Sequence, residues 1–272
     1  MYWQKRFDRV NPNHELEEKI IAICKAHKDY GYRRIHAVLR KQGFNVNKKR
    51  VQRIIQKLGL QVTSFTRKSR KYSSYKGNVG KVAPNRIHRR FNTSIPHQKI
   101  TTDTTEFKYF EIDSKGRMAI KKLYLDPFLD MFNGEVLSYS ISKSPSSNSI
   151  LTAQKKAIEI TSDCPYRRTF HSDRGWAYQM KAYSYKLKEN KIYQSMSRKG
   201  NCYDNSVMEN FFGILKQEMY YGTTYYSFNE LKNKIEKYIK YYNEKRIKEK
   251  LGWMSPVQYR LNTLAEYSSS FV

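Results

Sequence analysis

The chain has 272 residues, of which 52 are Lys or Arg and 24 are Asp or Glu, so its formal net charge is +28. This length is enough for a hydrophobic core and fits one large domain or two to three small ones. The positive excess favours a polyanionic partner and predicts binding to nucleic acid. No apolar run is long enough for a membrane-spanning helix, and the N-terminus lacks the apolar segment of a signal peptide. We therefore expect a cytoplasmic protein with no membrane partner.

The cysteines are few and dispersed through the chain, at Cys24, Cys164 and Cys202. Their odd number gives no disulfide framework, and neither a C-x-x-C pair nor a Cys/His group has zinc-ligand spacing. We therefore expect no structural zinc site.

Residues 1–60 are expected to form a small helical region that binds DNA. Between 15 and 60, apolar residues recur with helical spacing in three short segments, which glycines separate. Asn47 is a suitable N-cap for the third helix. The solvent side of that helix carries the basic residues Lys48, Lys49, Arg50, Arg53 and Lys57. This pattern is typical of a helix-turn-helix unit with a basic recognition helix. The alternative is a small helical bundle with solvated lysines, but the basic character of the remaining chain favours DNA binding.

Residues 61–96 are rich in Ser, Lys, Arg and Tyr and show little periodicity, so they are interpreted as a basic linker. The alternation of basic and aromatic residues suits a segment that follows a phosphate backbone. A merely soluble tether is an equally good interpretation.

Residues 97–222 are expected to form a mixed α/β core. Strand patterns cover 99–110, 118–125 and 135–142; a helix, strand, helix, strand and helix follow at 147–161, 168–171, 178–189, 191–195 and 204–220. Because parallel strands require crossover helices, this order predicts a mixed sheet with helices on its faces. Residues 223–272 are expected to form a C-terminal helical extension, with a helix from 228 and a second element at 255–262 that begins near Pro256.

Three carboxylates lie on three separate elements of the expected core. Asp103 lies within the first strand, Asp173 follows a strand in HSDRGW at 171–176, and Glu209 lies on a helix 35 residues after Asp173. Alone, Asp103 is better explained as an edge-strand or surface acid, and Asp173 also fits a turn, so each signal is weak by itself. Together they are what a divalent-metal site for phosphoryl transfer needs, because Mg²⁺ prefers oxygen ligands.

The helix of Glu209 also carries Lys216, seven residues on and on roughly the same face, where it could grip a DNA phosphate. Asp204 and Asn205 are expected to cap the start of this helix.

Asp103 in TTDTTEF, Asp173 in HSDRGW and Glu209 in SRKGNCYDNSVMENFFGILKQE resemble the DD(35)E signature of bacterial transposases of insertion-sequence family three. The resemblance extends to YGYRRI at 30–35, to VNKKRVQRII at 46–55 and to YYNEKRIKEKLGWMSPVQYR at 241–260. It thus covers nearly the whole chain.

The resemblance implies a ribonuclease-H-like, retroviral-integrase-like core with a five-stranded mixed sheet, preceded by the helix-turn-helix domain. Asp103, Asp173 and Glu209 would be the catalytic residues and would hold two Mg²⁺ (or Mn²⁺) ions. The implied reaction is DNA cleavage and strand transfer, by in-line attack of water and then of a 3′-OH. The expected partners are double-stranded DNA at the element ends and target, the product of an upstream reading frame, and further copies of this chain on nucleoid DNA.

Three alternatives stay open on the sequence. A nuclease of the same fold would cut without joining and would use a fourth acid, such as Asp204 or Glu106. A tyrosine recombinase would use the H-x-x-R spacing of His171 and Arg174, which belongs on a helix in an all-helical domain. A non-catalytic regulator would bind DNA through residues 15–60 and would not use the acids.

Overall fold

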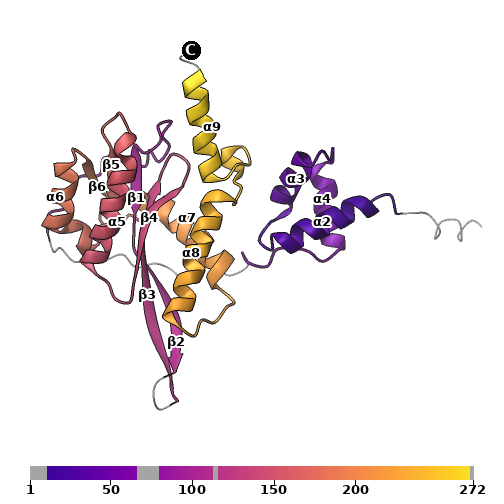
Figure 1. Ribbon diagram of the computed structural model, residues 1–272, viewed down its shortest axis with the longest axis horizontal. Helices are drawn as coiled ribbons and strands as arrows, with labels where there is room; N and C mark the ends of the chain where they lie inside the picture. Colours follow the sequence, from indigo (N-terminus) through magenta and orange to yellow (C-terminus); the bar gives the residue numbers. More distant parts are fainter. Residues whose placement is uncertain (1–10, 66–79, 113–115, 270–272) are drawn as a thin grey trace, which may run out of the picture. The chain divides into compact units, whose positions relative to one another are not determined.

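A computed structural model describes residues 11–65, 80–112 and 116–269, and part of the expected basic linker, 66–79, lies outside them. The chain divides into two compact units, one formed by its N-terminal part with residues 247–253 and the other by the remainder (Figure 1). Within the described residues, no helix combines the length and the apolar character needed to cross a membrane.

The described part of the first unit contains the three helices expected there. They are α2 (His14–Ala26), α3 (Tyr32–Lys41) and α4 (Lys48–Lys57). Their apolar faces meet in a core where Ile20, Ile35 and Val51 are fully buried. The predicted cap of α4 is confirmed, because the Asn47 side chain accepts a hydrogen bond from Lys49 N at 2.9 Å. Gly43 follows α3 with a φ of +88°, a conformation that residues with a Cβ rarely adopt.

The second unit is built on one mixed sheet. Its strands are β1 (Lys99–Thr102), β2 (Thr105–Ile112), β3 (Met118–Asp130), β4 (Val136–Ser142), β5 (Thr169–Ser172) and β6 (Tyr193–Met196). Strands β1, β2 and β4 all pair antiparallel with the long β3. On the other side of β1, β5 pairs with β1 and β6 pairs with β5, both in parallel. Since β2 continues the line of β1, the described strands occupy five positions across the sheet, as predicted.

Two strand boundaries differ from the prediction. The expected strand 99–110 is interrupted between β1 and β2, so Asp103 follows a strand end and does not lie mid-strand. The expected strand 118–125 continues to Asp130 through Pro127. A proline lacks the N–H for a sheet hydrogen bond, and the register with β4 shifts one residue after it, between Phe128 and Leu129.

Helices of the second unit cover both faces of its sheet. They are α5 (Ser147–Ile160), α6 (Lys181–Glu189), α7 (Ser206–Leu215), α8 (Phe228–Glu244) and α9 (Pro256–Ser269). The expected helix 178–189 begins only at Lys181, after a 3₁₀ turn, and the expected helix 204–220 passes into a wider π turn at Lys216–Tyr220.

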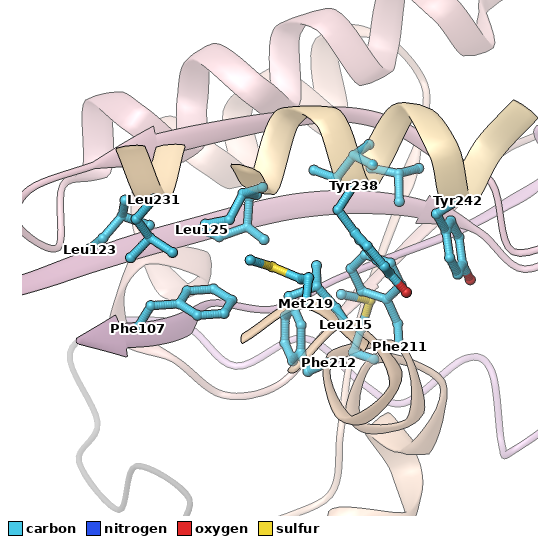
Figure 2. Close-up of a cluster of buried hydrophobic side chains, with 14 of the residues drawn as sticks. Phe107, Leu123, Leu125, Phe211, Phe212, Leu215, Met219, Leu231, Tyr238 and Tyr242 are labelled. Atoms are coloured by element: carbon cyan, nitrogen blue, oxygen red, sulfur yellow. The ribbon is translucent and has the colours of Figure 1, made fainter. Parts of the chain in front are cut away.

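Two hydrophobic cores hold these layers together. On one face, α5 and α6 pack on β1, β3 and β5 around Phe128 and Phe170. On the other, α7, the π turn and α8 pack on the β2–β3 hairpin, where Phe107, Leu123 and Leu231 come together (Figure 2). The helix that carries Glu209 is therefore fixed between the sheet and α8.

Candidate active site

Asp103 and Asp173 come together because β1 and β5 are parallel neighbours. Their last paired residues are Thr102 and Ser172, so each aspartate is the next residue at the same edge of the sheet. Asp103 Oδ1 accepts a hydrogen bond from Thr104 N at 2.7 Å, and Asp173 Oδ1 accepts one from Gly175 N at 2.8 Å. This is the carboxyl edge, where open α/β sheets commonly place their sites.

Gly175 allows Asp173 to fold back on its own turn. A Cβ at position 175 would lie only 2.9 Å from Asp173 Oδ1 and 3.3 Å from the Tyr178 ring. Real Cβ atoms are rarely so close to a neighbour, so a side chain there would displace the carboxylate.

Glu209, in the first turn of α7, is the third carboxylate of the site. Burial raises the pKa of Asp103 well above its usual range, and the charges of Asp173 and Glu209 raise it further. Burial also raises the pKa values of Asp173 and Glu209. The structure thus brings the three predicted acids within electrostatic range of one another.

Such a set fits a hard divalent cation, because all its donors are oxygens and a cation would offset the repulsion between them. The fit is incomplete in one respect. Among residues 11–65, 80–112 and 116–269, no three His, Cys, Asp or Glu side chains are arranged closely enough to hold a metal ion. Joint coordination by Asp103, Asp173 and Glu209 therefore requires these side chains to move closer together, and Glu209 is the exposed one of the three.

Asn205 has a role that the sequence analysis missed. Its Nδ2 donates a 2.8 Å hydrogen bond to Asp103 Oδ2, and both residues are buried. Asn205 occupies the N-cap position of α7, as predicted, but its side chain makes no capping hydrogen bond. This amide instead fixes the carboxylate oxygen of Asp103 that Thr104 does not bind.

Asp204 does not cap α7 either, but is the centre of an ionic cluster. Its side chain is fully buried and accepts hydrogen bonds from Asn85, Arg89 and Arg198 at 2.9 to 3.0 Å. These bonds, with those of Arg198 the strongest, hold its pKa well below the usual range. Since its oxygens are already occupied, Asp204 is a poor fourth metal ligand, which weighs against the nuclease alternative in the form that uses Asp204 and does not test the form that uses Glu106.

Asp126 is a further buried carboxylate beside the site. It lies on β3 and accepts hydrogen bonds from Thr104 Oγ1 at 2.7 Å and Ser140 Oγ at 3.1 Å. Burial raises its pKa despite these bonds. The Tyr178 hydroxyl lies 3.4 Å from Thr104 Oγ1, and burial together with Asp103, Asp126 and Asp173 raises its pKa well above the usual range. The sequence signal for Asp126 was the presence of an acid within the apolar run YLDPFL.

Lys216 lies in the π turn after α7, within electrostatic range of Asp103. Burial lowers its pKa, and the charges of Glu106 and Asp103 partly restore it. Its Nζ lies 5.2 Å from the centroid of the Phe107 ring.

The other basic residues predicted to bind DNA lie in the first unit. Lys48, Lys49, Arg50 and Arg53 are all exposed on α4. The Arg50 guanidinium is held by two hydrogen bonds to Asn13 Oδ1, at 2.6 and 3.1 Å. Exposure of these four residues on one helix is the arrangement expected of a recognition helix.

His171 has a structural environment. Its ring nitrogens lie 2.8 Å from Ser195 Oγ and 2.9 Å from the Asp204 carbonyl oxygen, and burial lowers its pKa. It lies on a central parallel strand and is nearly inaccessible. The tyrosine recombinase alternative, which needs this residue on a helix of an all-helical domain, does not fit.

The sheet order and the acids at its edge define a ribonuclease-H-like integrase core. Comparison with known families agrees, because two models described as integrase core domains match residues 93–202 and 209–264, and an HTH-like domain matches 12–69. The catalytic core domain of HTLV-2 integrase, solved in complex with magnesium, aligns with a TM-score of 0.44 at 20% identity, over 61% of this chain and 97% of that one.

The curated relatives are transposases. The chain is 40% identical over 264 residues to the putative transposase InsK of insertion sequence element IS150 from Escherichia coli, covering 96% of this chain and 88% of the relative. It is 45% identical over 224 residues to a transposase-like protein of Haemophilus influenzae, covering 82% and 97%. The chain belongs to the IS3 family of insertion-sequence transposases. It is a DDE integrase-core enzyme with a helix-turn-helix domain, as predicted, and this combination implies DNA as its partner.

Proposed function

We propose that this chain cleaves DNA at the ends of an insertion sequence and joins the freed 3′ ends to target DNA. Asp103, Asp173 and Glu209 would be the catalytic residues and would hold two Mg²⁺ or Mn²⁺ ions. The observation that carries the proposal is the placement of Asp103 and Asp173 at adjacent parallel strand ends, within range of Glu209.

The ions, when bound, would activate the attacking oxygen and stabilise the leaving 3′ oxygen. The side chains supply position and charge. Asn205 and Thr104 each hold one oxygen of Asp103, and the Gly175 amide holds Asp173. Lys216 would neutralise a phosphate of the bound strand. The first nucleophile would be water and the second the freed 3′-OH, both in line with the leaving oxygen, so no covalent protein intermediate is needed.

We further propose that α4 contacts DNA through Lys48, Lys49, Arg50 and Arg53. The complete reaction would involve several copies of this chain on nucleoid DNA in the bacterial cytoplasm. It would also involve the product of an upstream reading frame, bound or fused to this chain, as the resemblance implies.

The test is a joining assay with labelled DNA that carries candidate element ends, in Mg²⁺, for the chain alone and fused to its upstream frame. We expect 3′ cleavage and joined products that disappear in Glu209→Gln and persist in Glu189→Gln, a matched change at an exposed glutamate of α6. Unchanged joining by Glu209→Gln would refute the assignment. DNA binding without cleavage in either form would favour the regulatory alternative.

A further inference from the structure

The segment 80–92 lies along the edge strand β6. Arg86 N donates to Ser195 Oγ at 2.9 Å, and Ala83 N lies 3.4 Å from Met196 Sδ. The Asn85 side chain adds a 2.9 Å hydrogen bond to Asp204. The described end of the expected basic linker is therefore docked on the catalytic core.

The surface formed by this segment and by β6 with its flanking residues has one sign of charge. Residues 80–92 and 191–203 together contain seven Lys or Arg and no Asp or Glu. The seven are all exposed: Lys81, Arg86, Arg89, Arg90, Lys191, Arg198 and Lys199. The residue after 203, Asp204, is buried and pairs with Arg89 and Arg198, so the exposed charge stays positive, and a bound anion would offset the repulsion between these cations.

Two guanidiniums are fixed on one aromatic ring at this surface. Arg86 Cζ lies 4.3 Å and Arg167 Cζ 3.8 Å from the centroid of the Tyr193 ring. Arg167 also donates to the Tyr193 hydroxyl at 3.0 Å and to the Lys191 carbonyl oxygen at 3.1 Å. In the part of the chain that the structure describes, no carboxylate pairs with either arginine, so their charges are held in place yet not neutralised.

Two more arginines extend the surface toward the catalytic carboxylates. Arg89 and Arg198 share the single charge of Asp204, and their side chains stay 46% and 55% exposed. Arg89 also lies over the ring of Tyr203, which is 69% exposed. The residue that follows Asp204 is Asn205, whose side chain donates a hydrogen bond to Asp103. The row of arginines thus leads to the site through directly connected residues.

We propose that Arg86, Arg167, Arg89 and Arg198, with Tyr193 and Tyr203, form a second DNA-binding surface that holds the phosphate backbone of a strand entering the catalytic site. We call it the β6 surface. It consists of other residues than the basic set of α4. The proposal rests on the proposed function, because its ligand is DNA. Guanidiniums suit this ligand because they bind phosphate oxygens with two parallel N–H groups and keep their charge at any physiological pH. Contacts of this kind fix position without reading sequence.

The test is binding of the full chain to a labelled 40-base-pair duplex by fluorescence anisotropy, over a range of NaCl concentrations and in EDTA. Because each neutralised phosphate contributes about 0.9 to the slope of log K against log salt, Arg86→Gln/Arg167→Gln should lower that slope by about 2. Arg86→Lys/Arg167→Lys, which keeps both charges, should keep most of the slope.

The matched control is Lys155→Gln/Lys232→Gln, which removes two exposed, ion-paired lysines of α5 and α8. A slope change in the arginine variant no larger than in this control would overturn the proposal, as would equal losses for the Gln and Lys variants. If the double variant does not fold, the single variant Arg86→Gln replaces it, because the Arg86 side chain contacts only the ring of Tyr193 among the interactions of the described residues. This variant should lower the slope by about 1. Since EDTA prevents cleavage, a failure of the joining assay and a failure of this proposal are observed separately.

Discussion

Removal of Arg246 should strongly destabilise the catalytic core. Arg246 lies two residues after the end of α8, and its guanidinium forms three hydrogen bonds of 2.6 to 3.1 Å with Glu218 of the π turn. These two side chains are only 3% and 1% exposed. Tyr238 donates a further 2.8 Å hydrogen bond to Glu218. Arg246→Met would leave a buried carboxylate without its counter-charge, which costs about 3–5 kcal/mol. For a unit of this size, that loss corresponds to a decrease in Tm of about 6–20 °C.

The measurement is urea unfolding of Arg246→Met, Glu218→Gln and the double variant. Because Gln keeps a neutral acceptor for Tyr238, we expect the double variant to recover most of the stability that Arg246→Met loses. The matched control is Lys186→Met, which breaks the exposed pair with Glu189 and should cost less than about 1 kcal/mol. A loss in Arg246→Met as small as that of the control would refute the reasoning.

Three further outcomes are expected. Asn47→Ala removes the cap of α4 and should lower the stability of the helix-turn-helix unit by about 1 kcal/mol in a thermal melt, with Asn45→Ala as control. Burial raises the pKa of Asp130 to about 6 from 3.8, so its ionisation costs stability as the pH rises. Relative to Asp130→Asn, the protein should therefore lose about 2 kcal/mol of unfolding free energy between pH 4 and pH 7.5, and a constant difference would contradict this. Asn205→Ala frees one oxygen of Asp103. It should raise by about tenfold the Mn²⁺ concentration that is required both for the rise in Tm and for DNA joining. Equal Mn²⁺ requirements of the variant and the unchanged protein would show that Asn205 does not position Asp103.

The sequence predicted the elements whose hydrophobic period was clear. The three N-terminal helices, the strand–helix order of the core and the start of α9 at Pro256 are confirmed. The boundary at residue 222 between the core and a C-terminal extension stays a prediction. The helix that follows it, α8, places Leu231, Tyr238 and Tyr242 in the core against α7 and the sheet (Figure 2). Its amphipathic pattern gave the buried face without giving the surface against which it packs.

The parts of the site that were missed depend on contacts between distant residues. Asn205 and Asp103 are 102 positions apart, and Arg89 and Asp204 are 115 apart, so local propensity favoured helix capping for Asp204 and Asn205. The strand break at Asp103 follows from its place at the sheet edge, where its carboxylate accepts from Thr104 N. Only the fold determines which polar groups meet there, whereas the spacing of the three acids was visible in the sequence.

The measurement that tests the central claim most directly is the metal dependence of DNA joining by Asp173→Cys. A thiolate binds Mg²⁺ poorly and softer metals such as Mn²⁺ better. If Asp173 is a ligand of the metal used in the reaction, Asp173→Cys should be inactive in Mg²⁺ and regain joining in Mn²⁺, whereas Asp173→Ala should be inactive in both. Equal activity of Asp173→Cys in the two metals, or equal recovery of Asp173→Ala in Mn²⁺, would contradict a metal-binding role for this carboxylate.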